Sequence, residues 1–220
     1  MFLGHFGLAM GAKRVAPGPS LGTAILAAQW ADGIWPFFVL LGVERLAVAP
    51  GITRVTPLDF VSYPYSHSLV ADIGWSIAFA LVYGTLRRDW RGAAWLGVLV
   101  LSHWVLDVVA HRPDMPTWPG GPKLGFGLWN SLPGTLIVEF VLLAAGAWLY
   151  VKATQPRDKL GTILLAVFVA VLAALFLAST FGPPPPSAQA VAITGVAGWL
   201  FVAWGYWIDR HRALATPSRR

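Results

Sequence analysis

A stretch of 48 residues, from Gly161 to Ile208, contains no charged side chain and is interrupted by four consecutive prolines at 183–186. A helix needs roughly 20 apolar residues to cross the hydrocarbon core of a bilayer. The stretch is therefore long enough for two membrane-spanning helices joined by a proline-rich turn. Only 12% of the residues in the whole chain are charged, about half the share found in soluble domains. The sequence predicts an integral membrane protein.

The other long apolar segments predict four more spans. Windows of about 19 residues place the six expected spans at residues 20–43, 66–86, 92–111, 132–152, 160–181 and 188–208. A closed β-barrel, the other structure that spans bilayers, needs short strands of alternating polarity that this chain lacks. We therefore expect an all-α bundle of about six transmembrane helices, forming a single domain over residues 1–220. Residues 2–12 are too few to span a membrane and predict an interfacial or re-entrant helix.

The basic residues are distributed unevenly over the two sides of this bundle. Twelve of the 16 Lys and Arg residues lie on the side of the two termini, and four lie on the other side. Those four are Arg45, Arg54, Arg112 and Lys123. Because positively charged loops stay in the cytoplasm, we expect cytoplasmic termini and external loops at 44–65, 112–131 and 182–187. The first positive charges follow the apolar start of the chain, the reverse of a signal peptide, so we expect this segment to be retained.

The net charge and the absence of cysteine exclude several classes of function. The formal net charge is +6, but the basic residues form short clusters beside apolar segments, which is typical of membrane topology and not of nucleic-acid binding. The chain contains no cysteine, which excludes disulfides, thiolate metal sites and a cysteine nucleophile. Any metal ion must be held by histidines and carboxylates.

Ionisable residues, together with the amide of Gln29, occur in the first four expected spans, and the last two spans contain no His, Asp, Glu or Arg. They are Gln29, Asp32, His67, Asp72, His103, Asp107, His111 and Glu139. Such residues are costly inside a membrane and usually mark function. We therefore expect residues 1–152 to carry the chemistry and residues 160–208 to form a packing hairpin. Residues 209–220 are expected to form a basic tail at the anionic inner leaflet.

His103, Asp107 and His111 are spaced four residues apart, so they lie along one stripe of a single helix. Asp32 and His67 are expected at a similar depth on neighbouring helices, in the outer half of the bilayer. A mixed set of histidines and carboxylates suits Zn²⁺ or another divalent ion, with water in the open position. The alternative is that His103 and Asp107 only form a hydrogen-bonded pair.

The remaining carboxylates have less specific interpretations. Glu139 is isolated in the sequence, and two roles fit it equally well. It is either a general base or a group that supports the metal ligands from behind, or it is a protonated, hydrogen-bonded structural residue. Asp72 lies about 140° around the helix from His67, which favours packing or helix capping. Glu44 and Asp59 fall in an external loop and are expected to be solvated.

Four motifs together resemble a known family. They are Gly4-His5-Phe6-Gly7, Gln29-Trp30-Ala31-Asp32, Tyr65-Ser66-His67-Ser68-Leu69 and Leu101-Ser102-His103-Trp104-Val105-Leu106-Asp107. In this order they are similar to the bacterial inner-membrane proteins called membrane-bound metal-dependent hydrolases, which are distantly likened to zinc-dependent phospholipase C. The resemblance covers about residues 1–120. It departs at Gln29-Trp30-Ala31, where the family has Leu-Pro-Asp, so one family carboxylate is missing.

The resemblance implies a divalent metal, with zinc as the first choice, and a location in the bacterial inner membrane. The metal ligands that it implies are His5, Asp32, His67, His103 and Asp107. We therefore expect a metal-dependent hydrolase whose substrate is a lipid or a lipid-linked phosphoester. Asp107 is its expected catalytic carboxylate, and the candidate proton-transfer groups are His111, Asp114 and Glu139.

The expected partners of the chain are membrane lipids and a lipid-like substrate, without nucleic acid, in a homo-oligomer or a larger membrane complex. Two other classes of function remain open from the sequence. One is a transporter or channel that uses the polar stripe as an ion path. The other is an accessory subunit of a membrane complex.

Overall fold

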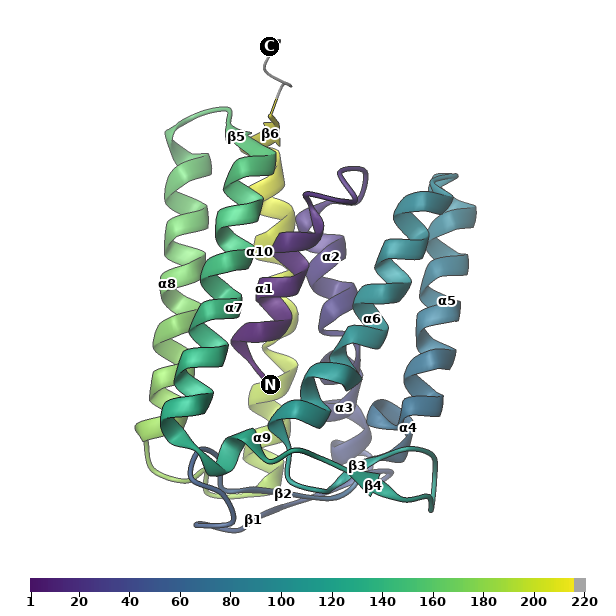
Figure 1. Ribbon diagram of the computed structural model, residues 1–220, viewed down its shortest axis with the longest axis vertical. Helices are drawn as coiled ribbons and strands as arrows, with labels where there is room; N and C mark the ends of the chain where they lie inside the picture. The colour runs from purple at the N-terminus through teal and green to yellow at the C-terminus, as the bar shows by residue number, and fades with distance from the viewer. Residues whose placement is uncertain (216–220) are drawn as a thin grey trace.

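The computed structural model describes residues 1–215, and its long helices confirm the predicted all-α bundle. Five helical segments are long and apolar enough to cross a membrane. They are α5 (Leu69–Arg87), α6 (Trp90–Ala110), α7 (Leu132–Ala153), α8 (Lys159–Phe181) and the pair α9 (Ala188–Val196) and α10 (Trp199–Arg210). Together with the bent pair described next, they form the upright bundle of Figure 1. The protein has the architecture of a polytopic membrane protein.

The first expected span, 20–43, is not one helix. It consists of α2 (Leu21–Ala28) and α3 (Trp30–Leu40), whose axes differ by 54°. Gln29 lies between them with non-helical backbone angles. It is both the C-cap residue of α2 and the N-cap residue of α3. The break exposes the end of α2 to the interior of the bundle, where the carbonyl oxygen of Ala28 accepts a hydrogen bond from a histidine on α6.

The second expected span, 66–86, also begins differently from the prediction. A separate short helix, α4 (Pro64–His67), precedes α5, and the chain is extended at Ser68 between them. The Ser68 hydroxyl accepts a hydrogen bond from the Ala71 amide and caps α5. His67 therefore ends α4 and does not open the membrane helix, which leaves its ring free to turn into the bundle.

The N-terminal helix α1 (Leu3–Ala12) lies inside the bundle, between α6 and α7 in Figure 1. Most of its residues are buried, so the interfacial placement does not hold and the helix enters the bundle interior. It packs against α7 where Gly7 faces Gly146. A Cβ atom on Gly146 would overlap the backbone of Gly7. This crossing needs glycine, and it carries the start of α1 to the centre of the molecule.

Replacing Gly146 with alanine should destabilise the protein by about 1–3 kcal/mol, the usual cost of overpacking a tight contact. We expect a lower melting temperature in detergent. The matched control is Gly74→Ala on α5, where a Cβ atom meets nothing within 4 Å. This control should be neutral or slightly stabilising because alanine favours helix. Equal melting temperatures for the two variants would contradict the proposed role of the crossing.

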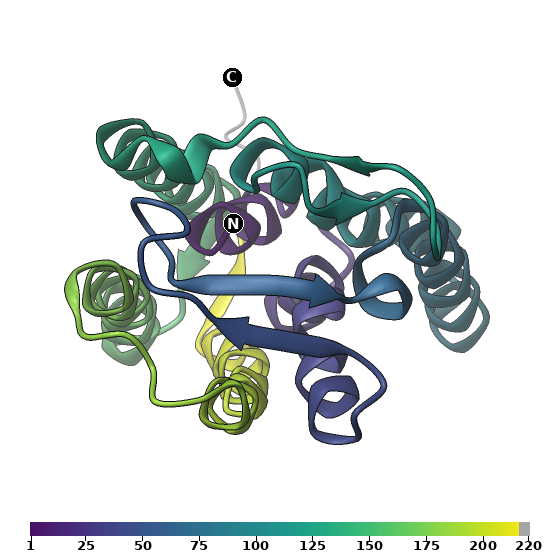
Figure 2. The same ribbon diagram turned by 90° about the horizontal axis from the view of Figure 1, so that it is seen from below.

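Short strand pairs close the two ends of the bundle and were not predicted. At one end β1 (Arg45–Val48) pairs with β2 (Leu58–Ser62), and β3 (Met115–Pro116) pairs with β4 (Lys123–Leu124), all antiparallel. The 3₁₀ helix η1 (Leu128–Asn130) leads from there into α7. Figure 2 shows β1 and β2 lying across this end of the bundle.

At the opposite end β5 (Thr154–Pro156) pairs with β6 (Arg212–Leu214). The first residues of the expected basic tail, 209–220, therefore belong to the end of α10 and to β6. Residues 216–220 of this tail lie outside the described part of the chain. The main apolar core lies between α1, α2, α6, α7 and α8. A smaller core lies beneath β1 to β4 and includes Trp35, Tyr63 and Trp104.

Candidate metal centre

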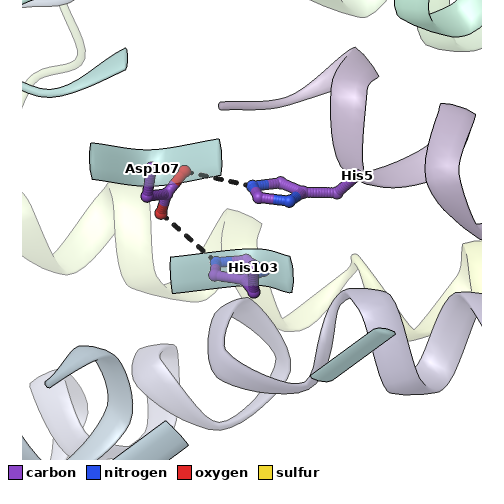
Figure 3. Close-up of side chains that lie close together, drawn as sticks. All are labelled: His5, His103 and Asp107. Carbon is purple, nitrogen blue, oxygen red and sulfur yellow. Dashed lines mark hydrogen bonds and ion pairs between the residues drawn. The ribbon is translucent and has the colours of Figure 1, made fainter. Parts of the chain in front are cut away.

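Two carboxylates and three histidines from α1, α3, α4 and α6 meet inside the bundle. His5 Nε2 lies 3.1 Å from Asp107 Oδ1, and His103 Nε2 lies 3.3 Å from Asp107 Oδ2. Figure 3 shows how His5 and His103 both point toward Asp107. Asp32 Oδ1 lies 3.4 Å from His67 Nε2 and 3.7 Å from His103 Nε2. The structure thus brings together all five residues that the family resemblance names as metal ligands.

The five residues form two groups whose donor atoms could each hold one metal ion. One group is His5, His103 and Asp107, and the other is Asp32, His67 and His103, with all donor atoms in a group within 4.8 Å of one another. His103 belongs to both groups. Because its Nδ1 atom is bonded elsewhere, His103 has a single free nitrogen, and that nitrogen serves one ion at a time. The arrangement fits one metal ion and not two.

The hydrogen bonds of the histidine rings direct their Nε2 atoms towards the centre. His103 Nδ1 donates to the carbonyl oxygen of Ala28 over 2.8 Å. His67 Nδ1 lies 2.7 Å from the Ser66 hydroxyl oxygen. In metal sites a ligating histidine usually uses its second nitrogen in this way, which fixes the tautomer and the ring orientation.

His103 Nε2 is buried and has no hydrogen-bond partner among residues 1–215. In the neutral ring the proton is on Nδ1, so a lone pair on Nε2 faces the carboxylate oxygens of Asp32 and Asp107. Two acceptors that face each other without a proton repel, and a buried acceptor without a partner costs free energy. A cation between these atoms removes both penalties. The geometry therefore fits a bound metal ion, and the alternative is a protonated Nε2 atom that pairs His103 with Asp107.

His111 lies beside this cluster, just after the end of α6. Its Nε2 atom is 3.8 Å from Asp107 Oδ2, and its Nδ1 atom donates to Asp114 Oδ1 over 2.9 Å. Asp114 also accepts hydrogen bonds from the Tyr63 hydroxyl and from Arg112 Nε. Burial acts to raise the pKa of Asp114, but the hydrogen bonds from His111 and Arg112 outweigh it and hold the pKa below its usual value. Asp114 therefore stays ionised behind His111.

Glu139 does not reach the cluster through any hydrogen bond to it. Its carboxylate accepts hydrogen bonds from the backbone amides of Phe2 and Gly4, at 2.9 and 2.8 Å. These amides open α1 and have no partner within the helix. Glu139 thus fixes the start of α1 and, with it, His5. Its predicted role in proton transfer stays a prediction.

Glu44 and Asp59 lie in surroundings that differ from the expectation, whereas Asp72 takes the first of its two expected roles, packing, and not capping. Glu44 is not solvated, since it is 1% exposed and accepts three hydrogen bonds from α4. Asp59 is half-buried and forms an ion pair with Arg112. Asp72 is fully buried, its oxygens have no hydrogen-bond partner in the described part of the chain, and Ser68 caps α5 in its place. The sequence contained a signal for Glu44, because α4 begins at a proline and needs an acceptor for its free amides.

The cluster is open on one side. The side chain of Asp32 is 42% exposed, whereas that of Asp107 is 4% exposed. A cavity of about 450 Å³ lies at the end of the bundle that carries β1 to β4, and Glu44, Arg45 and Ala188 are among its lining residues. None of the five cluster residues lines this cavity. Access to the cluster is therefore past Asp32.

Comparison of the chain with protein-family models, with curated proteins and with solved structures finds no match. The resemblance of its motifs to the metal-dependent hydrolases thus stays a prediction. The geometry of the described residues is the basis for assigning a function.

Proposed function

We propose that this protein is a membrane-embedded hydrolase that depends on one divalent metal ion, with zinc as the preferred ion. The observation that carries the proposal is the buried Nε2 atom of His103, which faces two carboxylates and has no hydrogen-bond partner among the residues that the structure describes. Three histidines and two carboxylates are donors that zinc accepts, whereas calcium and magnesium favour oxygen alone. When bound, zinc supplies Lewis acidity that activates water and polarises a phosphoryl oxygen.

Asp32, His67 and His103 would hold the metal, with Asp107 adjacent. Asp32 is the exposed member of this group, so it leaves one side free for water and substrate, as in catalytic zinc sites. His5 donates its Nε2 proton to Asp107 Oδ1, and its ring stacks on that of His103 with centroids 3.8 Å apart. His5 thus orients both residues.

His111 is the best-placed group for proton transfer. Its Nδ1 proton is held by Asp114, so Nε2 is the acceptor that faces the cluster. The ionised Asp114 stabilises the imidazolium that forms when His111 accepts a proton. This pairing of a histidine with an orienting carboxylate is typical of general bases.

The depth of the cluster supports a lipid or lipid-linked phosphoester as the substrate. His103 lies seven residues before the end of α6, which is about 10 Å at the rise of an α-helix. The polar phosphoester of a lipid lies near the membrane surface, and it can reach a site at that depth more readily than a site at the bilayer centre. We place the protein in the bacterial inner membrane with both termini in the cytoplasm, among lipids and in an oligomer or larger complex.

Cysteine labelling should test this orientation. Phe126 and Trp90 lie at opposite ends of the bundle, and their exposed fractions are 81% and 57%. The chain has no native cysteine, so Phe126→Cys and Trp90→Cys each introduce one reporter. In intact cells a membrane-impermeant maleimide should label position 126 and not position 90. Labelling of position 90 alone would show that the protein has the opposite orientation in the membrane.

The hydrolase proposal is tested with the purified protein in detergent or vesicles. We expect it to hydrolyse at least one phosphoester from a panel of phospholipids and polyprenyl phosphates. Chelation should abolish this activity, and added Zn²⁺ should restore it, because the metal activates the attacking water. Activity that survives complete metal removal would refute the proposal, as would failure of the metal-loaded protein to act on the whole panel.

A further inference from the structure

Glu44 is buried beneath α4, and its carboxylate accepts three hydrogen bonds. Its Oε1 atom accepts from the amides of Tyr65 and Ser66, at 2.8 and 2.9 Å. Its Oε2 atom accepts from the Ser66 hydroxyl at 2.6 Å. The two carboxylate oxygens thus accept hydrogen bonds from different groups. One binds the free amides at the start of α4, and the other binds a side chain.

The Ser66 hydroxyl connects Glu44 to His67. Its oxygen lies 2.7 Å from His67 Nδ1. A hydroxyl has one proton, and Ser66 donates that proton to Glu44. Ser66 must therefore accept from His67 Nδ1, which places the imidazole proton on Nδ1. The lone pair of His67 then lies on Nε2, the atom that faces Asp32.

We propose that Glu44 and Ser66 are positioning residues that hold His67 in the tautomer able to bind metal. This inference rests on the proposed metal centre and assigns a role to two residues outside its ligand set. His103 receives comparable support from a backbone group, the Ala28 carbonyl, whereas the support of His67 depends on the side chains of Ser66 and Glu44. Partners of this kind typically change metal affinity 10- to 100-fold when they are replaced.

Glu44→Gln separates this role from a purely structural one. The glutamine oxygen can still accept from the two amides of α4, so the helix keeps its cap. The amide nitrogen then lies against the Ser66 hydroxyl and can only donate to it. Ser66 must turn and donate to His67 Nδ1, which moves the imidazole proton to Nε2. The variant therefore reverses the direction of the hydrogen bonds without removing them.

We expect Glu44→Gln to weaken Zn²⁺ binding about 10- to 100-fold in a competition titration of the full-length protein. Ser66→Ala, which removes only the hydroxyl, should also weaken it. The matched control is Ser68→Ala, because the Ser68 hydroxyl binds the Ala71 amide and not His67. The control should bind Zn²⁺ within about twofold of wild type. Wild-type affinity in Glu44→Gln or Ser66→Ala would overturn the proposal.

A second readout needs no metal. The ¹⁵N resonances of His67, assigned by their loss in His67→Asn, report its tautomer in the metal-free protein. We expect a proton on Nδ1 in wild type and on Nε2 in Glu44→Gln, and the same tautomer in both would overturn the relay. If the wild type binds no metal, the proposed function fails, while this comparison still decides the role of Glu44 and Ser66.

Discussion

Replacing His103 with alanine should abolish metal binding. His103 belongs to both groups of donor atoms, so its loss leaves two ligands in either group, too few for a stable zinc site. The ring also anchors the broken first span through its hydrogen bond to Ala28. We expect elemental analysis of purified His103→Ala to find less than about a tenth of the wild-type zinc content. Replacing a residue that only hydrogen-bonds to a metal ligand already lowers metal affinity about 10- to 100-fold, and the loss of a ligand should cost more.

The matched control is His211→Ala. His211 pairs with Asp158 at the opposite end of the bundle and takes no part in the cluster. This variant should retain the zinc content and the activity of the wild type. Equal zinc in His103→Ala and wild type would show that the cluster is not the metal site.

Replacing Asp107 with asparagine should reduce hydrolysis roughly 100-fold or more, by analogy with the effects of metal-site residues. The asparagine keeps the shape of the side chain but loses the negative charge that balances the metal ion. The measurement is the turnover of the best substrate from the phosphoester panel, together with zinc content. Asp158→Asn, a change of the same kind at an exposed position, is the control and should leave turnover unaffected. Wild-type turnover in Asp107→Asn would remove Asp107 from the proposed mechanism.

Helical periodicity explains why part of the cluster could be predicted from sequence. His103 and Asp107 are one turn apart on α6 and face the same side, as their spacing requires. The same argument places His111 only approximately, because α6 ends at Ala110 and the chain then becomes extended. Periodicity therefore identifies residues on one helix and cannot follow them past its end.

The other members of the cluster depend on features that have no period. Gln29 interrupts the first span and turns α3, which carries Asp32, towards α6. The contact of Gly7 with Gly146 sets the depth of α1 and so the position of His5. Both are properties of packing between distant segments. The family motifs named His5 and Asp32, but only the fold shows how they reach His103.

Glu44 shows the opposite error, a site residue taken for a surface residue. Gly42 adopts a positive φ of 72° after α3 and reverses the chain, which brings Glu44 beneath α4. A loop carboxylate is ordinarily solvated, and the residues on either side of Glu44 do not indicate burial. The signal in the sequence lies further along the chain, at Pro64, where α4 begins. The free amides of α4 supply the partners that stabilise it there.

The most direct test of the metal centre is the zinc content of the wild-type protein, purified without added chelator and measured by mass spectrometry against protein concentration. The shared His103 nitrogen predicts about one ion per chain. A content near two would show that both groups of donors are filled and would contradict a single shared site. A content near zero that does not rise when the protein is incubated with Zn²⁺ would contradict the metal centre itself.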